Sequence, residues 1–327
     1  MTKMTLAPWL RAGALAALAA LAMGASLAHA DFPDHAVRLV VPFTPGGAVD
    51  GAARPTAVEM GKTLGQPLVI DNRPGSGGTI GIQAVAHAAP DGYTLLLGNI
   101  ALASAPALYP ASGINPKDFA PVALIGKTPY ILAVKQDFAA KSVAELVALA
   151  KANPGKYNYA SAGAGSAIHM AGEMFKSKAG IDVVHIPYKG AAPAMAALLA
   201  GDVEMVFGSL MEMKPMIQAG KVRALGVTSS TRSALVPTIP TLAESGVPGY
   251  AVTGWYGLYA PVKTPPAVLQ KLQTAAVAAL HSEAMRQQLA RYEMEPAGGG
   301  PKEAAEMLDS EVERWTAVIR QAHITIQ

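Results

Sequence analysis

The chain has 327 residues, of which 51% are hydrophobic and 15% charged, and this length predicts about two domains. It has no cysteine, which excludes disulfides, Cys-ligated zinc, iron–sulfur clusters and thiol nucleophiles. The net charge of +3 is small for this length and comes with no run of basic residues, so a nucleic-acid partner is not expected.

The first thirty residues predict a secretory signal peptide. Lys3 and Arg11 precede an alanine- and leucine-rich run at 12–22, and an A-x-A pattern follows at 28–30. A transmembrane anchor is the alternative, but the apolar run is shorter than the ~20 residues that a spanning helix needs. We therefore expect cleavage after Ala30 and a nearly neutral mature protein outside the cytoplasm, not embedded in a membrane.

Short apolar runs alternate with segments of helical periodicity along the mature chain. Pro55 lies inside the first helical segment and predicts a kink or a late helix start. Ser142 and Glu145 form a capping-box pattern that begins another helix. The predicted strands are 37–41, 68–70, 93–97, 157–159, 183–186, 205–207 and 225–227, and the predicted helices are 49–64, 142–151, one from Ala167, 269–280 and 308–319.

This alternation of strands and helices favours βαβ units, and hence an α/β fold with mostly parallel sheets. No linker-like composition separates two halves, so the chain is expected to cross between domains more than once. The predicted crossings are 130–134 and 255–260, because each is apolar and flanked by proline or glycine. Trp255 is interpreted as hinge or core packing.

Three glycine-rich loops each follow a predicted strand and precede a helical segment. They are 42–50, 161–166 and 187–191. Glycine lets the backbone approach a ligand, and the free N–H groups of a helix start suit a carboxylate. Single loops of this kind usually only reverse the chain, but three in one α/β protein predict an anion-binding cleft at the carboxyl ends of the strands.

The other patterns with a possible chemical role are weaker. The stretch 72–81 fails the dinucleotide pattern G-x-G-x-x-G, because Ile80 stands at the position of the third glycine. Ser166 and His169 lack a G-x-S-x-G elbow and a third orienting group, which argues against a hydrolase. The histidines show no metal-ligand spacing. Asp50 fits helix-dipole complementarity or a bond to the loop or ligand, and Lys189 fits either an anion contact or a solvated lysine.

These segments together resemble the substrate-binding receptors of tripartite tricarboxylate transporters, often called the Bug receptor family. The matching motifs follow one another from end to end of the mature chain. They are 42–47 with Asp50, 65–67 leading into 72–75, 91–93, 161–166 with His169, 185–190, 219–225, 237–238 with Glu244, 255–258, and the last helix with Glu311, Arg314 and Trp315.

The resemblance implies a two-domain, periplasmic-binding-protein-like α/β fold with the ligand cleft between the domains. Domain 1 would hold residues 31–129 and 257–327, and domain 2 residues 130–256. A carboxylate would be held by backbone amides, hydroxyls and water, with little use of an arginine. The residues carried over are Phe43, Pro45, Gly46, Gly47 and Asp50 on one wall, Ser161, Gly165, Ser166, Tyr188, Lys189 and Gly190 on the other, and Asn99, His169, Ala191 and Ser209 beside them.

The function implied is a periplasmic receptor that closes on a small carboxylate and delivers it to membrane transporter subunits through transient contacts. We expect a monomer that is not an enzyme and uses no cofactor or metal. An exported serine hydrolase, and a solute sensor of the same fold that is not coupled to transport, are the alternatives. The sequence does not specify which carboxylate binds, because backbone and water contacts have little side-chain signature.

Overall fold

The computed structural model describes residues 32–326, so the predicted signal peptide and its cleavage after Ala30 lie outside the described residues. Residues 32–34 contain no helix or strand, and all the elements below lie in residues 35–326. Within the described part of the chain, no helix is long and apolar enough to span a bilayer.

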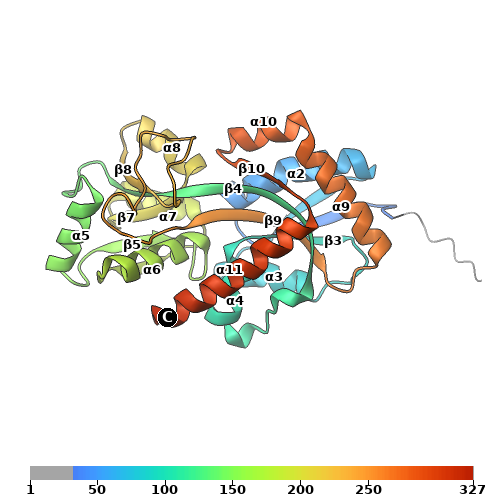
Figure 1. Ribbon diagram of the computed structural model, residues 1–327, viewed down its shortest axis with the longest axis horizontal. Helices are drawn as coiled ribbons and strands as arrows, with labels where there is room; N and C mark the ends of the chain where they lie inside the picture. Colours follow the sequence, from blue (N-terminus) through green and yellow to red (C-terminus); the bar gives the residue numbers. More distant parts are fainter. Residues whose placement is uncertain (1–31, 327) are drawn as a thin grey trace, which may run out of the picture. The chain divides into compact units, whose positions relative to one another are not determined.

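The described strands join in one ten-stranded sheet with the order β2-β1-β3-β9-β4-β7-β5-β6, in which β8 and β10 also pair with β4 (Figure 1). All the predicted strands form, with bounds shifted by at most a few residues. The strands are β1 (Val37–Val41), β2 (Leu68–Asn72), β3 (Thr94–Gly98), β4 (Phe119–Lys135), β5 (Asn158–Ser161), β6 (Val184–Pro187), β7 (Met205–Ser209), β8 (Val222–Val227), β9 (Thr253–Pro261) and β10 (Glu295–Gly299).

The helices cover this sheet and follow the predicted pattern. Of the two alternatives expected at Pro55, a kink or a late helix start, the late start is wrong, because the first long helix begins at Ala48, well before Pro55. The α-helices are α2 (Ala48–Leu64), α3 (Thr79–Ala86), α4 (Ile100–Leu108), α5 (Val143–Ala152), α6 (Ala167–Ala179), α7 (Ala191–Ala200), α8 (Leu210–Gln218), α9 (Pro266–His281), α10 (Glu283–Arg291) and α11 (Pro301–Gln321).

Two parallel sections of the sheet are joined by long antiparallel strands. β1 pairs in parallel with β2 and β3, which form the first parallel section, and β5 pairs in parallel with β6 and β7, which form the second. β4 pairs antiparallel with β9 and then with β7 and β8, and Figure 1 shows β4 and β9 running between the two sections. The predicted crossing segments lie in these two strands, whose antiparallel pairs make the sheet mixed.

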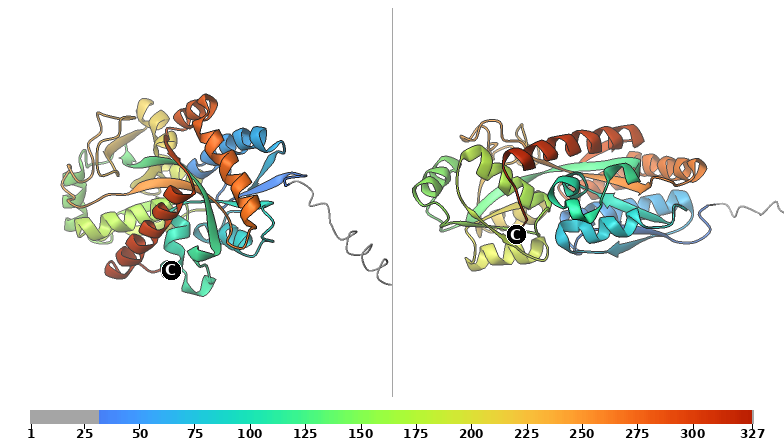
Figure 2. Two further views of the ribbon diagram at one scale, coloured as in Figure 1. Left: turned by 45° about the vertical axis from the view of Figure 1, so that its right-hand side comes forward. Right: turned by 90° about the horizontal axis from the view of Figure 1, so that it is seen from below.

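The last helix, α11, packs against the long strand β4 and hydrogen-bonds to β9. α11 packs on α4 and β4 (Figure 2, right). Its buried Glu311 accepts a hydrogen bond at Oε2 from Trp315 Nε1 at 2.9 Å and from Trp255 Nε1 of β9 at 3.1 Å. Trp255 therefore contributes to the core next to a predicted crossing, in agreement with its interpretation from the sequence.

Candidate functional site

Five helices begin at one small cavity between the two parallel sections. α2 and α4 follow β1 and β3, whereas α6, α7 and α8 follow β5, β6 and β7. The carboxyl ends of parallel strands face the same way, so each section directs its helix starts at the cavity. The cavity has a volume of about 60 Å³, and its lining from the helix starts is Gly47, Ala48, Val49, Asn99, Ser166, Ala167, Ile168, Ala191, Ser209 and Glu212.

Hydrogen-bond donors are therefore concentrated at the cavity. The first N–H groups of a helix have no partner within the helix. The residues that cap α2 and α7 are Gly47 and Gly190, which have no side chain to satisfy these groups. Asn99 caps α4 through Oδ1, which accepts from Ala101 N at 3.0 Å, so its side-chain N–H groups are left for other acceptors. Ser166 accepts from His169 N at 3.4 Å and keeps its hydroxyl proton to donate.

Asp50 stabilises the first glycine loop, residues 42–50, through hydrogen bonds on the side away from the cavity. Its buried carboxylate accepts from Gly46 N at 3.0 Å, from Arg54 Nε at 2.7 Å and from Asn72 Nδ2 at 3.1 Å. Burial acts to raise the pKa of Asp50, but the hydrogen bonds from Arg54, Gly46 and Asn72 outweigh it and lower that pKa. Asn72 also donates to Phe43 O at 3.0 Å. Asp50 does not line the cavity, and its carboxylate instead joins the loop to α2 through Arg54 and to β2 through Asn72.

Two histidines hold the second glycine loop in a similar way. Gly165 N donates to His169 Nδ1 at 3.1 Å, and Ser161 Oγ lies 2.6 Å from His185 Nε2 while accepting from Gly163 N. Burial lowers the pKa of His169 to about 4 and that of His185 to about 3. Both imidazoles are therefore neutral near pH 7, and for His169 the accepting Nδ1 requires this.

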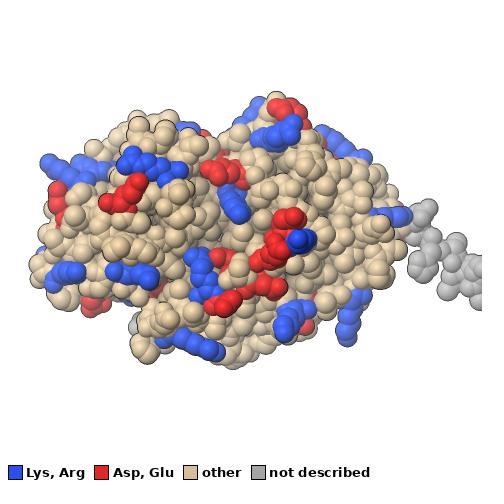
Figure 3. Space-filling view, viewed as in Figure 1, with Lys and Arg blue, Asp and Glu red and all other residues tan. Residues whose placement is uncertain are grey.

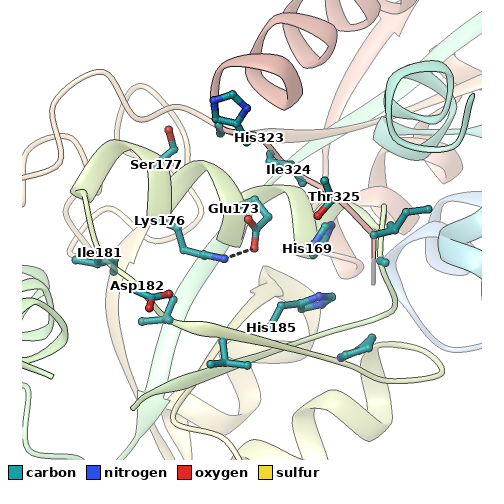
Figure 4. A pocket seen from close by; sticks show the side chains of 16 residues that line it. His169, Glu173, Lys176, Ser177, Ile181, Asp182, His185, His323, Ile324 and Thr325 are labelled. Carbon is teal, nitrogen blue, oxygen red and sulfur yellow. Dashed lines mark hydrogen bonds and ion pairs between the residues drawn. The ribbon is translucent and has the colours of Figure 1, made fainter. Parts of the chain in front are cut away.

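Behind the histidines lies a separate cavity of about 540 Å³, shown in Figure 4. Glu173 and Lys176 of α6 point into it and form an ion pair of 3.0 Å. His169 and His185 face each other in it, with ring centroids 4.2 Å apart. This cavity is larger than the one at the helix starts, but of those helices only α6 reaches it, through His169 and later residues. It therefore lacks the converging N–H donors of the small cavity.

The third glycine loop lines an outer cavity of about 730 Å³ that shares Phe43, Thr44 and Ala162 with the small one. Here loops of the two sections touch. The Tyr109 hydroxyl donates to Ala164 O at 2.6 Å. At Gly77, where φ is +62°, a Cβ atom would lie only 1.8 Å from Ala164 O, so no larger residue fits there without movement.

The predicted site residues thus separate by position. Phe43, Gly47, Asn99, Ser166, Ala191 and Ser209 line the small cavity, and Phe43, Tyr188, Lys189 and Gly190 line the outer one. Asp50, Ser161, Gly165 and His169 hold the loops, while Pro45 and Gly46 are exposed loop residues that line neither cavity.

Tyr130, Tyr256 and Glu212 line the small cavity and were missed from the sequence. The Tyr256 hydroxyl is buried, and its pKa is raised well above the usual value by burial and by the neighbouring Tyr130 and Glu212. Glu212 Oε2 accepts from Ser209 N at 3.1 Å and Ser209 Oγ at 2.7 Å. Burial raises the pKa of Glu212 despite these two bonds. The capping-box spacing of Ser209 and Glu212 was the available signal for Glu212.

Neither the surface charge in Figure 3 nor the placement of His, Asp and Glu side chains indicates a further site among the described residues. On the face in Figure 3, acidic and basic side chains are interspersed, with no large area of one sign. The described residues include no group of three or more His, Asp or Glu side chains placed to hold a metal ion.

Residues 52–324 match the family described as the tripartite tricarboxylate transporter family receptor. The chain belongs to this family. The solved periplasmic binding protein BugD is 35% identical, with a TM-score of 0.85, and the match covers 90% of this chain and 100% of BugD. The prediction of a Bug-type receptor is therefore confirmed.

Two further solved structures from Rhodopseudomonas palustris contain carboxylates. Rpa4515 with adipate is 36% identical, with a TM-score of 0.85, and the match covers 90% of this chain and 99% of that protein. MatC with bound malate is 35% identical, with a TM-score of 0.83, and the match covers 88% of this chain and 100% of MatC. These relatives confirm the predicted α/β binding-protein fold. They also confirm the prediction that the chain is a solute-binding receptor and not an enzyme.

Proposed function

We propose that this receptor binds a small carboxylate in the cavity where the five helices begin and delivers it to a tripartite tricarboxylate-type membrane transporter. It would act in the periplasm after removal of residues 1–30. The observation that carries the proposal is the convergence of five helix starts on a cavity that no described lysine or arginine lines.

Helix starts can replace a buried countercharge. Each helix N-terminus carries roughly half a positive charge and favours an anion by about 0.3–1 kcal/mol. Five of them, with amide and hydroxyl donors from Asn99 and Ser166, give an anion several directed hydrogen bonds. The adipate and malate in related structures support a carboxylate as that anion.

Closure of two domains would bury the ligand. We assign residues 31–129 and 257–327 to domain 1 and residues 130–256 to domain 2, with β4 and β9 as the hinge. The contacts of Tyr109 with Ala164, and of Thr44 with Gly190, join loops from opposite sides of this division. They would form when the domains close and separate when the ligand leaves.

A thermal-shift screen of residues 31–327 against mono-, di- and tricarboxylates tests the binding function. A true ligand at 100 times its Kd stabilises the protein by about 2.7 kcal/mol, which raises Tm measurably. The uncharged amides of the same acids are the matched control and should leave Tm unchanged. If no carboxylate raises Tm, or the amides raise it equally, the proposed function is wrong.

A further inference from the structure

A carboxyl group stands inside the proposed carboxylate cavity. Glu212 lies in the first turn of α8, and its Oε2 is held by two hydrogen bonds from Ser209. Its other oxygen, Oε1, points across the cavity toward Gly47, where a Cβ atom would lie 3.9 Å away. No described residue donates a hydrogen bond to Oε1. The cavity therefore offers an acceptor at this end, in contrast to the donors of the helix starts.

The hydroxyl of Tyr256 is a second polar group at this end of the cavity. Tyr256 is only 1% exposed, and the pKa of its hydroxyl is raised by burial and by the neighbouring Tyr130 and Glu212. Tyr130 lines the cavity next to it, and both hydroxyl groups lie close enough to Glu212 to interact electrostatically with its carboxylate. The two tyrosine hydroxyls and the Glu212 carboxylate therefore make this end of the cavity polar.

These groups restrict what a ligand can place there. An ionised Glu212 repels a second ligand carboxylate, and the low polarity of a buried site strengthens that repulsion. A hydroxyl or N–H group instead donates to Oε1, to which no described residue donates a hydrogen bond.

We propose that the cavity selects small carboxylates that carry a hydrogen-bond donor, a hydroxyl, amino or amide N–H group, at the end that meets Glu212 and Tyr256. Glu212 is the residue that determines this specificity, since it favours the donor and disfavours a second carboxylate. This inference rests on the proposed function, because it describes the far end of the same ligand.

Matched ligand pairs test the inference by isothermal titration calorimetry at pH 8. The pairs are glycolate with acetate, lactate with propionate, and 3-hydroxybutyrate with butyrate, and succinate and adipate supply the second carboxylate. The wild type should bind the hydroxylated member of at least one pair about tenfold more tightly than its parent acid and than either dicarboxylate, a difference of about 1.4 kcal/mol.

Glu212→Gln keeps the shape of the side chain but removes its charge. This variant should bind dicarboxylates about tenfold more tightly than the wild type and lose most of the preference for the hydroxylated acid. Glu145→Gln is the matched control, because Glu145 has the same place after Ser142 in the first turn of α5 but lies on the surface. Tyr256→Phe, which removes only a hydroxyl, should weaken binding of the hydroxylated acid more than that of its parent.

The outcomes separate the two proposals. Carboxylate binding without preference for a hydroxyl group, with Glu212→Gln and Glu145→Gln both matching the wild type, overturns the inference and leaves the proposed function standing. Absence of binding by every carboxylate in the set, together with no rise of Tm in the wider screen, overturns both. If Glu212→Gln fails to fold, the wild-type ligand pairs and Tyr256→Phe decide the inference.

Discussion

At the scale of single residues, the binding loops depend on side chains that do not face the ligand cavity. Asp50 is the clearest case, because the sequence places it within a glycine loop and the structure directs its carboxylate to Gly46, Arg54 and Asn72. An acid in such a loop therefore supports the loop backbone, and the backbone amides and the neutral side chains face the cavity.

Asp50→Asn should lower the free energy of unfolding at pH 7 by about 1–2 kcal/mol, because it removes charge-assisted hydrogen bonds from a buried group. Folding lowers the pKa of Asp50, so its stabilisation is present above the unfolded pKa of about 3.9 and is lost as pH falls through the folded pKa. Urea unfolding should thus show a difference at pH 7 that shrinks below about pH 4. Asp202→Asn, at an exposed residue, is the control and should show no such difference.

At the scale of elements, the loop at 161–166 and helix α6 form one unit with β6. His169 comes from the helix and His185 from the strand, and each hydrogen-bonds a different end of the loop. Neither histidine has a local pattern that predicts this role. The bond from Gly165 N therefore lasts only while the imidazole of His169 is neutral at Nδ1.

Acid should destabilise this unit in a defined range of pH. Folding lowers the pKa of His169 to about 4 and that of His185 to about 3, below the unfolded value of about 6.5. The unfolded state then binds more protons below pH 6.5, so stability falls from there toward pH 4, by about 1.4 kcal/mol per pH unit for each proton. His169→Gln should reduce this slope by about one proton, whereas a wild-type slope in the variant would contradict the assignment. His281→Gln, at an exposed residue, is the control.

At the scale of the folded unit, β4 and β9 connect two parallel sections whose loops meet. The tight approach of Gly77 to Ala164 and the bond from Tyr109 to Ala164 place a loop of each section against the other. The proposed hinge therefore predicts that ligand binding and loop contact occur together.

Gly77→Ala should hinder closure, because the added Cβ atom meets Ala164 O. We expect its ligand affinity to fall at least about tenfold, which is about 1.4 kcal/mol. Small-angle scattering should show the wild type becoming more compact with a saturating carboxylate and Gly77→Ala less so. Gly113→Ala has a similar φ of +69° but open space around it, and it controls for backbone strain. Identical wild-type curves with and without ligand would rule out the hinge closure.

The sequence by itself determined seven of the ten described strands, the three glycine loops and the family, because periodicity and turn residues act over short stretches of chain. It did not determine which side chains face the ligand. In the sequence, Tyr130 and Tyr256 are only parts of the apolar crossing segments 130–134 and 255–260. Glu212 is only the third residue after Ser209 in a capping-box spacing. They line the cavity because β4, β9 and α8 meet there, and such meetings depend on the packing of segments far apart in the sequence.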